Sequence, residues 1–412
     1  MMNAEQRYIQ KRLWKSRFES IPFYLSRVFP IKKNKIVFCC IEGTTGYTCN
    51  PKYIAEELIK QNQSSDKKYE LVWLVNDITK KFPKEIKVVK NTLWSRAYHL
   101  TTARFWIDNS RKQLEVRKRK GQIYIQTWHA KLGFKPTCLD RGASFSKIAY
   151  LVSKHDSDLV DYWLSNSDWY DKTLKTGSLY EGKTLRTGSP RCDILVKAGN
   201  DKDFKDKIKL RLCENYGIKA ENPDEIHFLM YAPTFRGGSQ GTNRIVEVGD
   251  HFPDYNVLKN ALENRFGGRW IIALRLHPQL VARNLDGGAI SDDITIDISR
   301  VDDMYEILAG CDAFMSDYSS AAFDAAVMKI PVFLYCDDYA EYEGERGKLL
   351  WDLKKESFPF AVATNDKELE ERIKEYDDAD YQLKLQKMFE ETGMVEDGNA
   401  AHEGVRFIKN RR

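Results

Sequence analysis

The segment Ser316–Tyr335, "SDYSSAAFDAAVMKIPVFLY", contains the arrangement on which the fold of this chain depends. The apolar run 313–315 leads into serines, an acid and a tyrosine, then an alanine-rich helical stretch follows, and a second apolar run surrounds Pro331. Two short apolar runs separated by one helix predict neighbouring parallel strands joined by a crossover helix. Unpaired N–H groups at the start of such a helix favour phosphate, whereas N-capping by Ser or Asp explains the same residues without a ligand. Both interpretations are open from these residues alone.

The alternation of strand and helix patterns extends over most of the chain. In the first half, apolar runs at 35–43, 69–77 and 122–129 are separated by stretches with helical spacing. In the second half, 226–236 and 270–279 are predicted strands that run into polar loops. A repeated βα order predicts an α/β fold with parallel sheets that carry helices on both faces. Because 412 residues exceed the size of one ordinary core, we expect two domains.

These patterns divide the chain into four expected parts. They are a basic amphipathic arm at 1–34, a Rossmann-like domain at 35–205, a second Rossmann-like domain at 220–390 and a tail at 391–412. The charged stretch 196–225, which contains "AENPDE" and few hydrophobic residues, predicts the linker. Open sheets of this kind bind ligands beyond the carboxyl ends of their strands. We therefore expect a cleft lined by residues that follow strands.

The composition argues against several classes of protein. The eight cysteines include no CxxC pair and no compact metal-ligand spacing, so buried reduced thiols in a cytosolic protein are expected. We expect no signal peptide, and no apolar run approaches the roughly 18 residues that a membrane-spanning helix needs. An integral membrane protein is therefore not expected.

The N-terminal arm combines positive charge with aromatic bulk. Residues 1–35 hold nine Lys/Arg against Glu5 and Glu19, a balance of +7. A basic helix that carries aromatic residues is typical of an interfacial anchor on anionic lipid, and the alternative is a helix that packs its aromatics on the protein body. No nucleic-acid motif accompanies the charge, so nucleic acid is not an expected partner. The apolar residues of the arm are Trp14, Phe18, Ile21, Phe23, Tyr24, Leu25, Val28 and Phe29.

Two histidines occupy matching positions in the two halves. His129 in "QIYIQTWHAKLG" and His277 in "IIALRLHPQL" each follow a predicted strand. An imidazole that titrates near neutral pH can take a proton from a hydroxyl nucleophile or donate to a developing phosphate charge. A structural role explains either histidine alone, but the matched positions favour a functional pair.

Two further segments suit a phosphate ligand. "YAPTFRGGSQG" (231–241) ends a predicted strand with Thr234, Arg236 and a Gly-rich turn. A guanidinium offers two donors in one plane, and glycines let backbone amides approach an anion; an ordinary surface loop is the alternative. Arg275 lies two residues before His277 and so shares its side of the strand, where it would contact substrate or pair with a carboxylate.

Taken together, these segments resemble the CDP-glycerol glycerophosphotransferase family, the teichoic-acid primases and polymerases of Gram-positive cell walls and related capsule enzymes. The resemblance covers roughly 35–375 and rests on an ordered set of motifs, of which "YAPTFR", "RLHP" and "SDYSS" are the most specific. The full set, in chain order, is "NPKYIAEEL", "IQTWH", "LSNSDW", "TGSPRCD", "YAPTFR", "LRLHP", "SDYSSAAFDAAVMKIPVFLY" and "ERGKLLWDL".

The resemblance implies a GT-B architecture, with two Rossmann-like domains facing a cleft and the nucleotide held mainly by the second. It also implies a reaction in which a hydroxyl on a polyprenyl-linked acceptor attacks the β-phosphate of CDP-glycerol, or of a related CDP-polyol, and CMP leaves. Members of the family are peripheral membrane proteins, which favours an anionic membrane surface at the cytoplasmic face of the cell membrane. The resemblance implies no definite cofactor, and whether the enzyme uses a weakly held divalent cation is an open question.

The family's functional residues carry over to matching positions in this chain. The resemblance implies that His129 deprotonates the acceptor hydroxyl, and that His277 with Arg236 stabilises charge on the transferred phosphate and on CMP. It places the phosphate-binding hydroxyls on Ser319 and Ser320. Since an acid beside phosphates would repel them, we assign Asp317 to the turn or to a donor hydroxyl. The remaining substrate-binding candidates are Thr234, Arg275 and Arg346 of "ERGKLLWDL".

The chain also departs from the family pattern. Many relatives have "WHGTPLKKLG", whereas this chain reads "WHAKLGFK", a shorter loop with Ala130 at the Gly position, and Cys192 stands where Asn is usual. The polyol is therefore open, with ribitol as one alternative to glycerol. A GT-B glycosyltransferase that uses a nucleotide sugar is the main competing function, and a membrane-bound scaffold without activity is the third.

Overall fold

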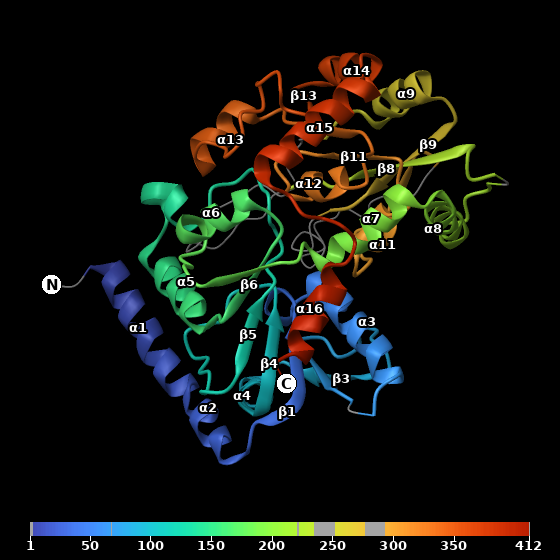
Figure 1. Ribbon diagram of the computed structural model, residues 1–412. Helices are drawn as coiled ribbons and strands as arrows, with labels where there is room; N and C mark the ends of the chain where they lie inside the picture. The colour runs from blue at the N-terminus through green and yellow to red at the C-terminus, as the bar shows by residue number, and fades with distance from the viewer. Residues whose placement is uncertain (1–2, 67, 221, 235–251, 277–292, 412) are drawn as a thin grey trace. The chain divides into compact units, whose positions relative to one another are not determined.

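The computed structural model describes residues 3–66, 68–220, 222–234, 252–276 and 293–411 (Figure 1). The chain forms two compact units. The first unit contains residues 1–131, 137–193 and 395–412, and the second unit contains residues 132–136 and 194–394. Each unit is built on one parallel sheet, which confirms the predicted α/β class with two domains.

The first unit holds a seven-stranded sheet in the order β3-β2-β1-β4-β5-β6-β7. All of its neighbouring strands pair in parallel. The strands are β1 (Lys32–Cys39), β2 (Glu70–Val75), β3 (Ile86–Lys90), β4 (Ala103–Asp108), β5 (Ile123–Gln126), β6 (Tyr162–Ser165) and β7 (Lys183–Arg186).

Helices cover both faces of this sheet because its strands are apolar on both faces. Ile36 and Phe38 of β1 point into one buried cluster, and Val37 and Cys39 point into the other. The first cluster includes residues of α3 and α16, and the second includes residues of α2, α4 and α6 (Figure 1). Burial on both sides is typical of parallel sheets joined by crossover helices. The helices of this unit are α1 (Ala4–Glu19), α2 (Ile21–Leu25), α3 (Cys49–Gln63), α4 (Leu93–Thr102), α5 (Lys147–Leu159), α6 (Asp168–Gly177) and α16 (Ala400–Lys409), with 3₁₀-helices η1 (Ser26–Val28), η2 (Ile41–Gly43), η3 (Cys138–Ser144) and η4 (Pro190–Cys192).

The second unit holds a six-stranded sheet in the order β10-β9-β8-β11-β12-β13. Its neighbouring strands also pair in parallel. The strands are β8 (Ile226–Tyr231), β9 (Arg269–Leu274), β10 (Thr295–Asp297), β11 (Ala313–Ser316), β12 (Val332–Tyr335) and β13 (Ala361–Ala363). The helices are α7 (Asp193–Asn200), α8 (Lys202–Asn215), α9 (Tyr255–Phe266), α11 (Met304–Leu308), α12 (Ala321–Ala326), α13 (Tyr339–Arg346), α14 (Asp366–Lys374) and α15 (Asp378–Thr392).

The segment with which the sequence analysis began forms the predicted strand, turn, helix and strand. β11 pairs in parallel with β12, with Phe314 opposite Val332 and Ser316 opposite Leu334. α12 makes the crossover, and all six of its residues are buried. This compact unit places the serine-containing turn directly after the carboxyl end of a central strand.

The domain boundaries differ from the predicted ones at both ends. The main crossing lies between residues 193 and 194, and the region predicted to be a linker contains α8, whose Ile208, Leu212 and Cys213 are buried. Most charged residues of α8 lie at exposed or half-buried positions, so a charge-rich composition was misread as a linker. The expected C-terminal tail is also wrong, because 395–412 belongs to the first unit, where Val405 and Ile408 of α16 enter a core cluster.

The N-terminal arm forms α1 and α2 and turns its aromatic residues outward. The buried residues of α1 are Ile9 and Ser16, whereas Trp14 is 56% exposed and Phe18 is 64% exposed. Phe23 is fully buried and is the aromatic residue of the arm that packs onto the protein body. A set of the arm's other large apolar residues is exposed. That set comprises Tyr8, Trp14, Phe18, Ile21, Tyr24, Leu25, Val28 and Phe29. Among the described residues, no helix is long and apolar enough to cross a membrane.

Candidate functional site

His129 lies just beyond the carboxyl end of β5, where the main chain is strained. The preceding residue, Trp128, has a φ of 49°, and its ring stacks on the imidazole with centroids 4.6 Å apart. Nδ1 of His129 lies 2.7 Å from the carbonyl oxygen of Asn109. Because a carbonyl oxygen only accepts, Nδ1 carries the proton, and the lone pair of the neutral ring is on Nε2.

Two segments that are far from His129 in the sequence hold the main chain at this residue. Asn50 donates from Nδ2 to the carbonyl oxygens of Thr127 (3.3 Å) and Trp128 (2.8 Å). Its Oδ1 accepts from the backbone N–H of Arg191 at 3.1 Å. The Arg191 guanidinium in turn donates to the carbonyl oxygen of His129 at 2.5 Å. The motifs "NPKYIAEEL", "IQTWH" and "TGSPRCD" therefore converge on one strand end, and we call Asn50 and Arg191 the His129 clamp.

The environment of His129 favours the uncharged imidazole. The pKa of His129 is lowered to about 4, chiefly because surrounding protein atoms disfavour the charged ring, and Arg191, Arg111 and Lys131 repel a proton further. The hydrogen bond to Asn109 acts in the opposite direction. The residue nonetheless keeps an exposed surface, so water reaches it. At neutral pH Nε2 is therefore available to accept a proton.

In the second unit, Asp317 joins two of the predicted phosphate-binding segments. Its carboxylate accepts from the backbone N–H of Thr234 at 3.0 Å and from the Thr234 hydroxyl at 2.9 Å. It also accepts from the N–H of Tyr318 at 2.6 Å. Asp317 is 3% exposed, so its charge is used to hold the ends of β8 and β11 together. This geometry favours the turn role that we expected for Asp317.

Ser319 and Ser320 lie at the start of α12, half-buried, as the sequence predicts. Ser319 Oγ accepts a long 3.3 Å hydrogen bond from the N–H of Ala321. Among the described residues, Ser320 makes no side-chain capping bond to the helix, so capping does not explain its presence. Gly133 approaches Ser320 closely, since a Cβ on that glycine would lie 3.6 Å from the serine Cβ. Phosphate binding by this pair stays a prediction.

Arg275 is buried and bonded to the protein main chain, unlike a side chain that is free to contact substrate. It is 9% exposed, and Nη1 donates to the carbonyl oxygens of Ile298 (2.7 Å) and Ser299 (2.9 Å) and also to that of Val301. The guanidinium thus holds the loop after β10. This geometry favours a positioning role over direct contact with substrate.

The other predicted residues have no described side chain. Arg236 and His277 lie outside the described residues, and Arg346 ends α13 with a side chain that is likewise outside them. The roles predicted for these three residues are therefore untested. Within the described ranges, no group of three His, Cys, Asp or Glu residues has the arrangement of a metal site.

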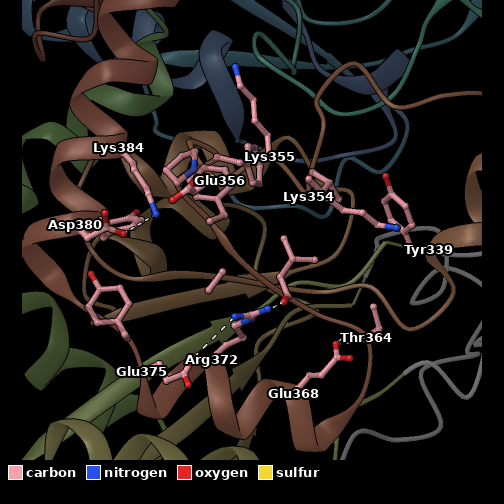
Figure 2. Close-up of a pocket in the computed structure, with 18 of the residues that line it drawn as sticks. Tyr339, Lys354, Lys355, Glu356, Thr364, Glu368, Arg372, Glu375, Asp380 and Lys384 are labelled. Atoms are coloured by element: carbon pink, nitrogen blue, oxygen red, sulfur yellow. Dashed lines mark hydrogen bonds and ion pairs between the residues drawn. The ribbon is translucent and has the colours of Figure 1, made fainter.

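A cavity of about 810 Å³ lies in the second unit along the edge strand β13 (Figure 2). Arg372 donates to the outward carbonyl oxygen of Val362 in β13 at 3.3 Å, and Lys384 pairs with Asp380 at 2.6 Å. Figure 2 shows these charged side chains engaged with partners of opposite charge or with the main chain. None of the described candidate residues lines this cavity. Because it contains none of these residues, we do not assign the cavity to catalysis.

Sequence reasoning missed the residues that orient His129. Asn50 and Arg191 stood in quoted motifs without a role, and Asn109 lay inside "RFWIDNS" (104–110), a segment predicted only to be a strand. Only Asn109 carried a weak signal, because it directly follows the strand β4 and open parallel sheets bind ligands beyond the carboxyl ends of their strands. Only the sheet order, with β4 beside β5, shows which residues meet.

Comparison with known proteins finds relatives that act in teichoic acid synthesis. The chain is 26% identical over 386 residues to the teichoic acid poly(glycerol phosphate) polymerase of Staphylococcus epidermidis, covering 90% of this chain and 50% of that protein. It is 27% identical over 378 residues to the teichoic acid glycerol-phosphate transferase of Staphylococcus aureus, covering 90% and 91%. It is 29% identical over 264 residues to the teichoic acid ribitol-phosphate primase of Bacillus spizizenii, covering 62% of each. The chain thus spans about half the length of the first relative.

The fold comparison and the family model give the same answer. The solved structure of the wall teichoic acid polymerase TagF matches with a TM-score of 0.76 and 25% identity, covering 100% of this chain and 98% of that one. This match confirms the predicted GT-B-type fold. The model of the family described as CDP-Glycerol:Poly(glycerophosphate) glycerophosphotransferase matches residues 21–410. Since that match spans nearly the whole chain, the protein belongs to the CDP-glycerol:poly(glycerophosphate) glycerophosphotransferase family and is an enzyme of that family.

Proposed function

We propose that this enzyme transfers a polyol phosphate from CDP-glycerol, or a related CDP-polyol, to a hydroxyl of a lipid-linked acceptor and releases CMP. The product would be part of a teichoic acid or a capsular polymer. The observation that carries the proposal is the environment of His129. Its imidazole is uncharged, has a fixed tautomer and lies at a strand end where three family motifs meet. A relative, TagF, has been solved after soaking with CDPG, which supports the donor class.

The reaction follows from in-line displacement at phosphorus. Nε2 of His129 takes the proton of the acceptor hydroxyl while its oxygen forms a bond to the β-phosphorus. The bond from that phosphorus to the oxygen bridging the two phosphates breaks, and CMP leaves with this oxygen and its electron pair. The Asn109 carbonyl keeps its hydrogen bond to Nδ1 and stabilises the imidazolium that forms. Phosphoryl transfer asks the protein mainly for position and charge stabilisation.

The donor phosphates are assigned to the second unit. Ser319 and Ser320 donate hydrogen bonds from their hydroxyls to the pyrophosphate. Asp317 keeps Thr234 and the serine turn in place. His277 and Arg236, which lie outside the described residues, stabilise the transferred phosphate and the departing CMP by analogy with the family.

A donor panel tests the proposed function. The full chain is incubated with CDP-glycerol, CDP-ribitol or a UDP-sugar together with a lipid-linked disaccharide analogue, and released nucleotide and product mass are measured. We expect CMP from a CDP-polyol and a product heavier by one polyol phosphate. The Ser319→Ala/Ser320→Ala double variant should raise the KM for the donor by about tenfold or more, the loss of hydrogen bonds to a charged group. UDP release without CMP would instead establish the competing glycosyltransferase.

The arm supports membrane association, which we include in the proposal. Trp14, Phe18, Ile21, Leu25 and Val28 follow a four-three spacing through α1, α2 and η1 and are all exposed. Such spacing places side chains on one face of a helix. Exposed aromatics beside exposed cations bind the interface of an anionic bilayer, so the arm would keep the enzyme at the cytoplasmic membrane face, near its acceptor.

Replacing Trp14 and Phe18 together with serine should release the protein from vesicles. Burial of one aromatic side chain contributes about 1.5–3 kcal/mol, so the double change is expected to weaken partition by well over tenfold. Sedimentation with vesicles that contain an anionic lipid measures the partition. Leu383→Ser is the matched control, because it removes an apolar side chain that is 67% exposed on α15. Equal binding by the arm variant and wild type would contradict membrane anchoring.

A further inference from the structure

The 3₁₀-turn after β1 adopts a conformation that its residues rarely take. Ile41, Glu42 and Gly43 have φ angles of 43°, 56° and 82° in succession. Positive φ suits glycine but is strained for glutamate and more so for a β-branched residue. Strained residues of this kind persist only where surrounding contacts hold them, and they cluster at functional sites. We call Ile41–Gly43 the Glu42 turn.

Two of the contacts that hold the Glu42 turn come from the strand end that also holds His129, and others come from Asn76 and Asn91. The N–H of Ile41 donates to Asn109 Oδ1 at 2.8 Å, and the N–H of Glu42 donates to Ser110 Oγ at 2.9 Å. The carbonyl oxygen of the same Asn109 accepts from His129 Nδ1 at 2.7 Å. Asn109 is fully buried, and its side-chain oxygen bonds the turn while its carbonyl oxygen bonds the imidazole. A displacement of the Glu42 turn therefore acts on the orientation of the imidazole.

The Glu42 side chain connects this turn to the arm. Gln113 donates from Nε2 to Glu42 Oε1 at 3.1 Å, and Gln113 Oε1 accepts from Arg12 Nη2 at 3.1 Å. Within α1, all of which is described, the other four cations are exposed and Arg12 is half-buried. Those four are Arg7, Lys11, Lys15 and Arg17. Arg12 is thus the cation of α1 that faces the protein body.

We propose that Glu42 and Gln113 are positioning residues that link the seating of helix α1 at an anionic lipid surface to the orientation of His129. The proposal rests on the proposed function, because it assigns a membrane partner to the arm and a base to His129. The buried residues of α1 are Ile9 and Ser16, so the helix is held on the body by few contacts. A surface that holds the outer face of α1 therefore biases whether Arg12 stays on Gln113.

The linkage makes the orientation of His129 depend on whether α1 is seated at the membrane. With α1 seated, Arg12 fixes Gln113, Gln113 fixes the Glu42 carboxylate, and the strained turn holds Asn109 under the imidazole. With α1 displaced, Glu42 loses its side-chain support, and the strained turn, then held by its main-chain hydrogen bonds alone, shifts more readily towards ordinary backbone angles. His129 then loses its fixed tautomer, and the base is less often aligned with the acceptor hydroxyl.

The test compares two variants in the relay with a charge-matched control. Arg12→Ala and Gln113→Ala break successive bonds of the relay, whereas Lys11→Ala removes the same charge as Arg12→Ala from the exposed face of the same helix. Nitrogen-15 histidine NMR of the full chain, with the His129 signals identified by their loss in His129→Asn, reports the tautomer and titration of that ring. Turnover is measured in parallel on vesicles that carry the acceptor analogue.

We expect both relay variants to mix the His129 tautomers, and kcat to fall by about fivefold, the loss of one net hydrogen bond. Arg12→Lys, which keeps a donor for Gln113, should restore much of the wild-type signal. Lys11→Ala should weaken vesicle binding at least as much as Arg12→Ala but leave the His129 signals as in wild type.

Two results would overturn the proposal. One is a wild-type His129 spectrum in both relay variants, and the other is an equal change in Lys11→Ala, which would show an effect of charge alone. The NMR readout does not depend on turnover. If the wild type releases no CMP from any CDP-polyol, the proposed function fails while the linkage is still decided by the spectra.

Discussion

Replacing His129 with alanine is expected to reduce CMP release from the CDP-polyol by about 10²–10⁴-fold, the usual contribution of a general base. The imidazole is at the end of β5 with Nδ1 bonded to Asn109, so its removal takes away the proton acceptor without opening the core of the sheet. Steady-state CMP release at saturating acceptor measures the effect, and circular dichroism checks the fold.

His402→Ala is the control for the His129 change. His402 is exposed on α16 and contacts Glu57 at 3.3 Å, away from the His129 clamp. We expect wild-type CMP release from this variant. Retention of turnover in His129→Ala would remove the base assignment.

The pH dependence of activity is a second test of His129 as the general base. A general base must be uncharged, and the pKa of His129 is lowered from 6.5 to about 4 by the surrounding protein and its neighbouring cations. Activity is therefore expected to persist as the pH falls through 6.5 and to be lost only towards pH 4. An acid limb near 6.5 that disappears in His129→Ala would show an ordinary histidine pKa and contradict the environment described for this ring.

Replacing Asn50 with alanine is expected to reduce both stability and turnover. Asn50 is fully buried and makes hydrogen bonds to Thr127, Trp128 and Arg191. Loss of its amide leaves buried groups unpaired, which costs about 2–4 kcal/mol of unfolding free energy. Because Trp128 is held at a positive φ, the strand end should relax, and we expect kcat to fall by about 10²-fold through misplacement of the base.

The matched control for this change is Asn62→Ala in the same helix. Asn62 bonds to the main chain of Tyr69 through both ends of its amide, at 3.1 and 2.8 Å, but takes no part in the clamp. It should lower stability by a smaller amount and leave kcat unchanged. Denaturant unfolding and steady-state kinetics measure the two quantities. If Asn50→Ala loses stability but keeps kcat, the clamp supports the fold and does not position the base.

Several features were predictable because they depend on neighbours in the chain. The β11–α12–β12 unit follows from the period of apolar residues, and the positions of His129 and Ser320 follow from their places after strands. The aromatic arm was also visible, but its two interpretations were not separable, because helical spacing does not say which face meets the body. In the structure Trp14 is 56% exposed and so does not pack on the body, whereas membrane binding by the arm stays a proposal.

Other features depended on contacts between distant residues. Composition placed a linker where α8 packs its buried face, since a half-buried helix and a solvated linker can carry the same charges. The C-terminal helix α16 returns to the first unit, which no local pattern near 395–412 indicates.

The local order of strands, turns and helices, and with it the family motifs, can be read from the chain because secondary structure follows periodicity over about ten residues. The orientation of His129 cannot, because it depends on Asn50 and Arg191, whose mutual hydrogen bond joins residues 141 positions apart. The same holds for the Glu42 turn, where φ angles that its residues disfavour are held by Asn109 and Ser110 from the neighbouring strand end. Which side chains meet at a strand end is decided by the sheet order, and sheet order is set by the packing of the whole unit.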